Sequence, residues 1–488
     1  MILLGGNLNV KESFLPLKVR GLLEGLRSRA IYVAGGAVRD TLLQRPFKDL
    51  DLTLADQALP LAQELASSLN GKFVVLHEEE GVIRVVAQEG FFLDLSEFRK
   101  GAQTIEEDLW QRDFSVNALA VPLGEFLTCP PHEWRIIDPT GGLKDLKHGI
   151  IRALRRQNLE DDPLRLLRAY RLKGELGFSI EARTREWIKE LAPRILNVAP
   201  ERVGTELKLL FEHPAGEAVS LMAEDDLLFV IFPELKEAQG VAQPSFHHLD
   251  VLGHLLLSLE KADLVLQNPH QYFGPPPGQD PFQEVVSQPE EQAIVRLAAL
   301  FHDLGKPQTF ALRHRITFYE HDRKGAERFQ GIGERLRFSK KFTKSVALLI
   351  RHHMRPFHLL GEFRRGRLTK RAMRRLLKDV PHYVSLFLVA MADSLASSGP
   401  DKESDLESEL AALFWEIHRF QEETFSVQQE QRLVTGQDLI EIFGLEPGPL
   451  FRELLEAVEE ARVEGKISDR EEALNYLAKI IAQRFAQG

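Results

Sequence analysis

The feature that most restricts the fold of this chain is a change of hydrophobic period near residue 158. Before it, short runs rich in Val, Ile, Leu and Phe alternate with polar residues, a pattern typical of strands. After it, apolar residues recur at three- and four-residue spacing, which is typical of amphipathic helices. Because 488 residues are too many for a single core, we predict an α+β chain with a small α/β head and a long helical remainder. The expected elements of the head are strands at 30–36, 49–55, 71–77, 81–88 and 91–98 and a helix at 58–69.

Breaks in composition divide the chain further. Residues 268–292 are rich in Pro and Gln and predict a long surface loop between helices, and a second break lies at 397–409. No repeat of fixed period is present. We therefore expect four parts, which are a head at 1–145, a helical neck at 146–240, a helical body with the inserted loop at 241–400, and a helical tail at 401–488.

Composition excludes several protein classes. Cys129 is the only cysteine, so no intrachain disulfide can form, and we expect a reducing compartment and a cytoplasmic location. The N-terminus lacks the basic start and long apolar core of a signal peptide, and no apolar run approaches the ~20 residues of a membrane span. The net charge of −10 argues mildly against a large nucleic-acid footprint, although a local basic patch can override that mean.

Two carboxylates stand two residues apart in the second expected strand. Side chains alternate along a strand, so Asp49 and Asp51 point to the same face and repel each other unless a cation lies between them. Carboxylates that act together with substrate phosphates are the usual ligands of Mg²⁺. Asp94 alternates with apolar residues in a later strand and is a candidate third carboxylate. The pattern predicts a magnesium site on this face of the sheet.

A glycine turn precedes these carboxylates. Gly35 and Gly36 would let the backbone approach a phosphate closely, and the helix that follows would offer its free N–H groups to the same anion. Arg39, in the first turn of that helix, would add a guanidinium to the phosphates. A glycine turn and an acidic strand end are each common without any function, so it is their combination in this order that favours a nucleotide site.

The stretch 32–55 resembles the head domain of class II nucleotidyltransferases, the family of tRNA CCA-adding enzymes and bacterial poly(A) polymerases. The hallmark of that family is G-G-x-V-R-D followed by D-x-D, and the segments 106–120, 137–146 and 161–172 resemble its further motifs in the same order. The resemblance implies a nucleotidyltransferase-type head. It implies these roles: Asp49, Asp51 and Arg112 in catalysis, Asp49 and Asp51 at the metal, and Gly35, Gly36, Arg39 and Arg112 at the nucleotide.

A second set of polar residues recurs every three positions in the segment 161–172. Asp162, Arg165, Arg168 and Arg171 would share one face of a helix over two turns, and a solvated charged stripe is the simpler interpretation. A carboxylate only accepts hydrogen bonds and a guanidinium only donates them. An Asp beside an Arg can therefore pair with the amino group and ring nitrogen of C or A, and it discriminates against U and G, which present the reverse order. In the family the Asp and the first Arg of this helix read the base, which implies that role for Asp162 and Arg165 and places all four residues at the nucleotide. Asp161 stands where the family pattern has Glu.

The connection before the segment 106–120 is short. The CCA-adding and A-adding members of the family usually carry a flexible loop of some ten to twenty residues here, whereas this chain has only residues 100–105. In the family that loop lets the template switch from C to A, and its loss marks the CC-adding members. The resemblance therefore implies addition of two cytidines, with complete CCA addition by another route as an alternative.

A histidine–aspartate pattern lies in the helical body. His302 and Asp303 are adjacent in an apolar segment, His254 lies on an earlier amphipathic segment and Asp393 on a later one. Such residues can converge on a divalent transition metal that hydrolyses a phosphoester, or they can persist in a degenerate scaffold that binds RNA. The order resembles the HD superfamily of metal-dependent phosphohydrolases, and the resemblance implies these four residues as ligands. Further histidines of the region are His321, His352 and His353.

The segment 362–379 carries eight basic residues between Arg364 and Lys378. On a single helix they would form a broad positive face suited to RNA phosphates, or a solvated face paired with acidic neighbours. The segment 433–449 resembles a helical element near the C-terminus of the family, which implies contact between the tail and tRNA.

These features together predict a tRNA nucleotidyltransferase. The 3′-hydroxyl of the RNA would attack the α-phosphate of CTP, and of ATP if the product is CCA, and pyrophosphate would leave. Three alternatives remain at this point. They are a bacterial poly(A) polymerase, a phosphohydrolase whose head is not catalytic, and an RNA-binding protein without catalysis.

Overall fold

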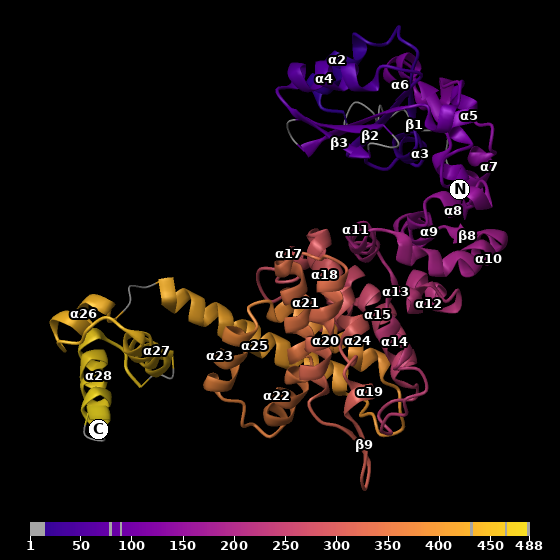
Figure 1. The fold of residues 1–488 in the computed structure, drawn as a ribbon. Coiled ribbons are helices and arrows are strands. Elements are labelled where there is room, and N and C mark those ends of the chain that lie inside the picture. The colour runs from indigo at the N-terminus through magenta and orange to yellow at the C-terminus, as the bar shows by residue number, and fades with distance from the viewer. Residues whose placement is uncertain (1–14, 78–80, 88–89, 430–432, 464–465, 486–488) are drawn as a thin grey trace. The chain divides into compact units, whose positions relative to one another are not determined.

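The structure of this chain is a computed structural model that describes residues 15–77, 81–87, 90–429, 433–463 and 466–485 (Figure 1). The N-terminal segment that was tested for a signal peptide and residue 88 of the fourth expected strand lie outside the described residues. The chain forms two compact units, Met1–Pro233 and Glu234–Gly488. In the described part of the chain, no helix combines the length and the apolar character that crossing a membrane requires.

The first unit contains a mixed sheet of six strands in the order β3-β4-β5-β2-β1-β6. Only β2 and β5 pair in parallel, and the other neighbours are antiparallel. All five expected strands are confirmed within the described residues, and a short sixth strand joins the edge beside β1. The strands are β1 Ile31–Ala34, β2 Asp49–Leu54, β3 Lys72–His77, β4 Val82–Val86, β5 Phe92–Glu97 and β6 Ala120–Pro122.

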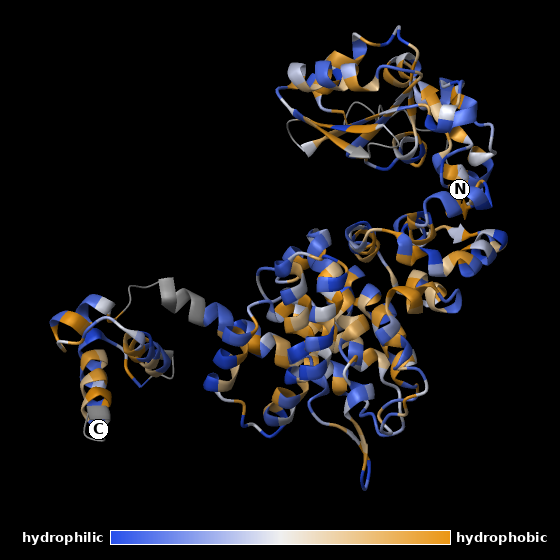
Figure 2. Ribbon diagram, viewed as in Figure 1, coloured by the Kyte–Doolittle hydropathy of each residue, from blue (hydrophilic) through white to orange (hydrophobic). Residues whose placement is uncertain are grey.

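Helices pack against this sheet through their apolar sides. The predicted helix is confirmed as α4, which buries Leu61, Leu65 and Leu69 at its period of three to four residues and contacts β3, β4 and β5. Figure 2 shows apolar residues concentrated along the strands. The helices of this part are α2 Leu17–Glu24, α3 Gly36–Leu42, α4 Ala58–Leu69, α5 Ile105–Leu109, α6 Leu123–Thr128 and α7 Gly142–His148, with short 3-10 turns at Arg99–Gly101 and Ser115–Asn117.

The remainder of the first unit is helical, with one two-stranded pair, β7 with β8. Helix α9 buries Leu166, Leu167 and Tyr170 on one side and turns its arginines to the other. Asp162 was predicted to lie on this helix, and that placement is wrong. It has extended backbone angles between α8 and α9, because Pro163 disfavours the helical region for the residue before it. The elements are β7 Ile150–Ile151, α8 Arg156–Asp161, α9 Leu164–Leu176, β8 Ser179–Ile180, α10 Ala182–Leu191, a 3-10 helix Ala192–Asn197, α11 Pro200–Phe211, α12 Gly216–Glu224 and α13 Leu227–Ile231, and the short helix α14 Pro233–Lys236 lies at the boundary with the second unit.

The second unit is a helical bundle around α24, which is apolar on all sides and almost wholly buried. Helices α15, α18, α21 and α25 contact it. A small hairpin, β9 with β10, joins α19 to α20. The elements are α15 Val251–Gln267, α16 Pro269–Phe273, α17 Gln283–Ser287, α18 Pro289–Phe301, α19 Lys306–Thr309, β9 Phe310–Leu312, β10 Ile316–Phe318, α20 His321–Arg335, α21 Lys340–His352, α22 Arg355–Arg364, α23 Lys370–Asp379, α24 Tyr383–Ala396 and α25 Leu406–Gln429.

Two expectations for the second unit are wrong. The Pro- and Gln-rich segment 268–292 is not a plain surface loop, because it forms α16 and α17 and buries Phe273 and Phe282 against Phe414 of α25. Aromatic burial of this kind outweighs the loop tendency of the surrounding Pro and Gln.

The basic segment 362–379 is two helices rather than one, because the chain turns at Gly366, with φ +63°, before Thr369 caps α23. Several of its cations pair with acids, as Arg364 does with Glu409 and Lys378 with Glu456. Pairing with acidic neighbours therefore accounts for much of this basic face.

A separate apolar cluster holds the C-terminal helices together. Leu439, Leu454, Val458 and Leu477 are buried in it. Thr435 and Asp438 form a capping box at the start of its first helix, which satisfies backbone donors reciprocally. The helices are α26 Gly436–Glu441, α27 Pro449–Val463 and α28 Arg470–Phe485.

Candidate active site and metal centre

Three carboxylates share one face of the sheet in the first unit. Asp49 and Asp51 are two residues apart on β2, and Asp51 lies level with Asp94 of the parallel strand β5. Burial raises the pKa of Asp51 to about 6, and the charges of Asp49 and Asp94 add to the rise against the opposing effect of Arg112. Burial and the charge of Asp94 also raise the pKa of Asp49. The folded chain thus concentrates negative charge that a hard divalent cation would neutralise.

The backbone at Gly35 passes directly beside this acidic face. Its φ of +76° favours glycine, and a Cβ there would lie 2.6 Å from Oδ2 of Asp51 and 3.0 Å from Nη1 of Arg112. The turn was predicted to approach a phosphate, and that stays a prediction; in the structure the groups nearest to Gly35 are the carboxylate of Asp51 and the guanidinium of Arg112. Gly36 begins α3.

Arg112 reaches the acidic face from the turn that follows α5. It is buried, its Nη2 donates to Oγ1 of Thr53 at 3.0 Å, and its Nε donates to Oδ2 of Asp108 at 3.3 Å. Because Thr53 is two residues beyond Asp51 on β2, the acid and the arginine lie side by side on the same face. Burial lowers the pKa of Arg112, and nearby Arg99 lowers it further.

Sequence reasoning missed two residues of this site, Asp108 and Arg99. Asp108 is fully buried and accepts from the backbone and side chain of Arg99 at 2.9–3.1 Å as well as from Arg112. Burial opposes its ionisation, but the two arginines hold its pKa below the ordinary value. The four-residue spacing of Asp108 and Arg112 is the signal that could have found this pair.

Arg39 is placed differently from the expectation. Its guanidinium is buried and donates to both oxygens of Asp40 at 2.8 and 2.9 Å, to Oδ1 of Asn117 at 2.8 Å and to Oε1 of Glu175 at 3.1 Å. In this structure Arg39 joins α3 to α9, because a buried guanidinium needs acceptors for its donors.

Asp94 lies on the predicted face, but it already has a cationic partner. Both of its oxygens accept from Arg84, at 2.6 and 2.7 Å. The structure thus leaves Asp49 and Asp51 as the better-suited ligand pair of this face.

The predicted base-reading residues come together at the start of α9. Oδ1 and Oδ2 of Asp162 accept from Nη2 of Arg202 on α11, at 3.3 and 3.1 Å, a partner that the sequence did not indicate. Nη1 of Arg165 donates to the carbonyls of Gln111 and Asn158, at 3.1 Å each. These contacts attach the start of α9 to the turn that carries Arg112.

The two later arginines of the same face are engaged within the protein. Nε of Arg168 donates to Asp113 at 2.9 Å, and Arg171 pairs with Glu175 at 2.5 Å and also with Glu206. Burial opposes ionisation of Asp113, but Arg168 and Arg165 hold its pKa well below the usual range.

The connection between β5 and α5 is as short in the structure as in the sequence. It contains a 3-10 turn, Arg99–Gly101, in which Lys100 has a φ of +50°. The ammonium of Lys100 forms an ion pair with Asp161, immediately before Asp162. The short connection is therefore tied to the residue that precedes Asp162, in the segment predicted to read the base.

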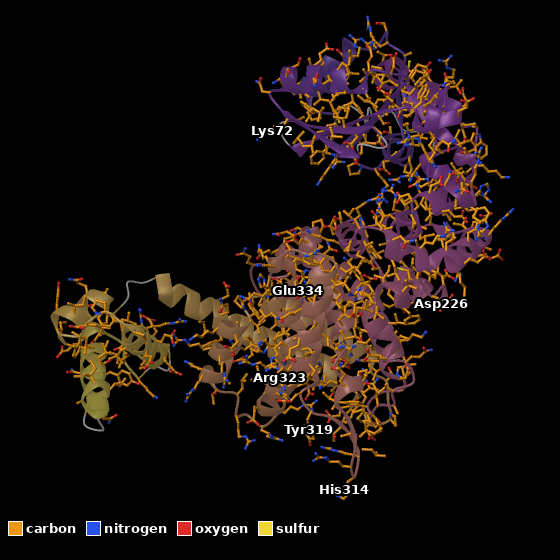
Figure 3. All side chains as sticks on the ribbon, in the orientation of Figure 1. Lys72, Asp226, His314, Tyr319, Arg323 and Glu334 are labelled. Carbon is orange, nitrogen blue, oxygen red and sulfur yellow. The ribbon has the colours of Figure 1, made fainter. Side chains whose placement is uncertain are left out.

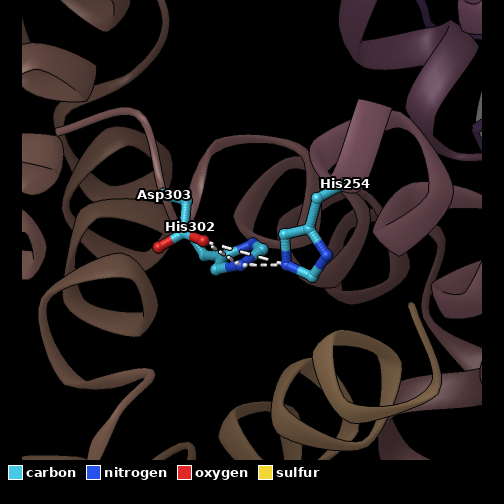
Figure 4. A group of neighbouring side chains, drawn as sticks. All are labelled: His254, His302 and Asp303. Atoms are coloured by element: carbon cyan, nitrogen blue, oxygen red, sulfur yellow. Dashed lines mark hydrogen bonds and ion pairs between the residues drawn. The ribbon is translucent and has the colours of Figure 1, made fainter. Parts of the chain in front are cut away.

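The four residues predicted as metal ligands in the second unit converge. Nε2 of His254 lies 3.2 Å from Nε2 of His302 and 3.0 Å from Oδ1 of Asp393, and Nε2 of His302 lies 3.1 Å from Oδ2 of Asp303. Figure 4 shows His254, His302 and Asp303 turned toward one another. The side chains come from α15, the end of α18 and α24. Two imidazoles and two carboxylates suit a divalent transition metal.

Comparisons with known proteins bear on both units. Residues 31–152 match the Poly A polymerase head domain, residues 177–239 a probable RNA and SrmB-binding site of polymerase A, and residues 256–398 the HD domain. A fourth match, over residues 416–478, is to domain 2 of tRNA nucleotidyltransferases. The A-adding tRNA nucleotidyltransferase of Deinococcus radiodurans is 32% identical over 469 residues, which cover 93% of this chain and 95% of that protein. The chain belongs to the tRNA nucleotidyltransferase family.

Other relatives of this tRNA nucleotidyltransferase extend the comparison. The CC-adding tRNA nucleotidyltransferase of Thermus thermophilus is 33% identical over 91% of this chain and 92% of that protein. The fold resembles that of the Thermotoga maritima CCA-adding enzyme complexed with tRNA, with a TM-score of 0.59, 22% identity and coverage of 97% and 98% of the two chains. The predicted family and fold class are thus confirmed, and the chain is an enzyme of the nucleotidyltransferase class, whose members use divalent metal ions. The two curated relatives differ in the nucleotide that they add.

Proposed function

We propose that this enzyme transfers CMP from CTP to the 3′ end of tRNA, adds two cytidines and stops. The observation that carries the choice of product is the short connection at residues 98–104, which Lys100 ties to Asp161 beside the base-reading Asp162. A template held in this way would keep one base preference. The CC-adding relative supports this product, and the A-adding relative supports the alternative that this chain adds adenosine.

The acidic face would hold the metal ions of the transfer reaction. Its donor set of carboxylates fits Mg²⁺, and burial together with the charges of Asp49 and Asp94 raises the pKa of Asp51 even with Arg112 nearby, which supports a cation at this face. Bound Mg²⁺ would lower the pKa of the attacking hydroxyl and neutralise charge on the departing pyrophosphate. We assign Asp49 and Asp51 as its ligands, and Asp94 as a residue that keeps Arg84 beside them.

The chain's own cations would stabilise the triphosphate. The tRNA 3′-oxygen forms a bond to the α-phosphorus of CTP, and the bond from that phosphorus to the pyrophosphate oxygen breaks. Arg112, placed beside Asp51, would neutralise the charge that develops on the phosphate oxygens. Asp108 positions Arg112 and brings Arg99 to the same place.

The base would be read at the start of α9. The carboxylate of Asp162 can accept about four hydrogen bonds, so it can accept from the cytosine amino group while Arg202 keeps its contact. Arg165, anchored through Nη1, would donate to the ring nitrogen. Arg168 and Arg171 would hold α9 in place through Asp113 and through Glu206 of α11. Arg39 would support the nucleotide indirectly, by joining α3 to α9.

We further propose a division of labour along the chain. Residues 1–145 carry the transfer chemistry, 146–240 read the base, 241–400 contain a metal centre and 401–488 contact the tRNA. His254, His302, Asp303 and Asp393 would hold one divalent transition metal ion, because their ligand atoms lie 3.0–3.2 Å apart in successive pairs. A cytoplasmic location remains the prediction from the single cysteine.

One experiment separates the products. The enzyme is incubated with a tRNA that lacks its 3′-terminal CCA, or with one that already ends in CC, in the presence of CTP alone, ATP alone or both, and product length is read to one nucleotide. Extension by two cytidines with CTP, and no further growth when ATP is added, is expected. Extension only of a tRNA that already ends in CC, and only with ATP, would instead establish adenosine addition and overturn the proposal.

A further inference from the structure

One row of charged side chains crosses the sheet of the first unit. Arg84 of β4 lies level with Asp94 of β5, and Asp94 lies level with Asp51 of β2. Residues directly opposite each other on neighbouring strands point to the same face, so the guanidinium and the two carboxylates share it. Ile83 and Val85, on either side of Arg84, are buried on the other face. The row thus places a cation two strand spacings, about 10 Å along the backbone, from a proposed metal ligand.

The guanidinium of Arg84 is held on two sides. Its Nε and Nη2 donate to the two oxygens of Asp94, at 2.7 and 2.6 Å. The ring of Phe92, two residues before Asp94 on β5, lies with its centroid 4.7 Å from Cζ of Arg84. A carboxylate that accepts two parallel hydrogen bonds and an aromatic ring beside the cation both restrict the direction in which the guanidinium points. Arg84 is therefore oriented before any ligand arrives.

Part of this guanidinium remains available to a ligand. The contact with Asp94 uses Nε and Nη2, and within the described residues Nη1 of Arg84 makes no hydrogen bond. The side chain is 31% exposed. The row ends at Val74 of the edge strand β3, which is itself 51% exposed, and Figure 3 shows Lys72 of the same strand at the border of the head. The N–H groups of Nη1 therefore lie where an anion from solvent can reach them.

Arg84 and Arg112 approach the acidic face from different sides. Hydrogen bonds to Asp94 raise the pKa of Arg84, and the charges of Asp49 and Asp51 add to this rise, so the guanidinium is within electrostatic range of all three carboxylates. Arg112 contacts the face from the side of β1 and is more enclosed, with a side chain that is 7% exposed. A cation on each side of a proposed metal site suits a ligand that carries several phosphates.

We propose that Arg84 binds the pyrophosphate part of the nucleotide and stabilises it as the leaving group, with Asp94 as the residue that positions Arg84. This inference rests on the proposed function. The leaving group must depart to solvent, and Arg84 is the more exposed of the two arginines. When the bond between the α-phosphorus and the bridging oxygen breaks, its electron pair stays on the pyrophosphate. Arg84 donates hydrogen bonds to that group and keeps its own protons, because a guanidinium stays ionised in proteins.

Binding of pyrophosphate tests the proposal directly, because this probe lacks the base and the α-phosphate. Pyrophosphate with Mg²⁺ is titrated into the full chain by isothermal titration calorimetry, and a chain carrying Asp49→Asn and Asp51→Asn measures the binding that occurs outside the head. Arg84→Met should weaken the affinity of the head for pyrophosphate by about 10–100-fold, the usual effect of losing hydrogen bonds to a charged group. Arg29→Met, at an exposed arginine of the same unit, should leave it unchanged. Equal affinity in Arg84→Met and the wild type would overturn the proposal.

A second set of variants separates phosphate binding from the simpler role of a countercharge. Arg84→Met leaves the carboxylate of Asp94 without its partner, whereas Arg84→Met combined with Asp94→Asn removes both charges at once. The combined variant should bind pyrophosphate as weakly as Arg84→Met does. Asp94→Asn alone should show an intermediate affinity, because the guanidinium keeps its charge but loses its anchor. Wild-type affinity in the combined variant would show that Arg84 serves only to neutralise Asp94.

This proposal and the proposed function fail in different ways. Pyrophosphate is released whether the enzyme adds cytidine or adenosine, so the test does not depend on the choice of base. If the wild type binds no more pyrophosphate than the chain carrying Asp49→Asn and Asp51→Asn, the acidic face does not bind nucleotide phosphates and both proposals are overturned. If the wild type binds pyrophosphate at the head and Arg84→Met binds it equally well, nucleotidyl transfer stands and only the role of Arg84 is refuted.

Discussion

Replacing Asp51 by Asn is expected to stabilise the metal-free head while abolishing nucleotidyl transfer. The fold raises the pKa of Asp51 from 3.8 to about 6, because burial removes the carboxylate from water and Asp49 and Asp94 repel it. Each unit of pKa corresponds to about 1.4 kcal/mol, so the ionised side chain costs the metal-free folded state about 3 kcal/mol above pH ~6. For a folded domain of the size of the first structural unit, each kcal/mol of added stability raises Tm by about 2–4 °C. The Tm of Asp51→Asn should therefore be about 6–12 °C above that of the wild type at pH ~8.

The sign of the pH dependence follows from the same shift. The folded state binds the proton of Asp51 more tightly than the unfolded state, so the free energy of unfolding of the wild type falls as pH rises from about 4 to about 6. Asp51→Asn removes this contribution, and the two proteins should converge at pH ~4. Added Mg²⁺ should restore stability to the wild type at pH ~8 and have little effect on the variant.

Thermal melts in EDTA and in Mg²⁺ at the two pH values measure these effects, with CTP incorporation as the activity readout. Asp56→Asn is the matched control, because Asp56 is an exposed acid just beyond the same strand. If Asp51→Asn melts no higher than the wild type in EDTA at pH ~8, or gains as much from Mg²⁺, the reasoning about the acidic face is refuted.

Three further substitutions test other parts of the structure. Gly35→Ala would place a Cβ 2.6 Å from Oδ2 of Asp51 and so displace this carboxylate. Because a misplacement of about 1 Å in a catalytic group costs on the order of 100-fold in rate, CTP incorporation should fall by that amount. The far-ultraviolet circular dichroism spectrum should stay unchanged. Asp108→Asn removes the negative charge that contacts both Arg99 and Arg112, so KM for CTP should rise. The free energy of unfolding of the head, measured by denaturant titration, should fall by about 3–5 kcal/mol. An unchanged KM would contradict the positioning role of Asp108. Phe282→Ala removes a buried ring that contacts Phe414, so the free energy of unfolding of the second unit should fall by about 3–5 kcal/mol while CTP incorporation is retained. A variant as stable as the wild type would show that the Pro- and Gln-rich segment is not part of that core.

Much of the head could be predicted because its signals are local. The alternation of β2 places Asp49 and Asp51 on one face whatever the rest of the chain does, and the period of α4 fixes which side is buried. The adjacency of His302 and Asp303 similarly indicated part of the candidate metal centre.

Contacts between distant segments could not be predicted in this way. The partners of Arg39 lie 78 and 136 residues away, and Arg202 lies 40 residues from Asp162. Arginine patterns look alike whether they face a phosphate or a buried carboxylate, so only packing distinguishes the two. The same holds for Phe282, whose burial depends on α25 more than a hundred residues later.

The sequence by itself determined the strand and helix periods, the paired acids and the residue types of both candidate sites, because each of these depends on spacings of only a few residues. The tertiary structure decided which charged side chains pair with each other, and it directed the two oxygens of Asp303 to different histidines. The reason is physical: the energy of a charge depends on its burial and its nearest partners, and both are set by segments that meet only when the chain folds.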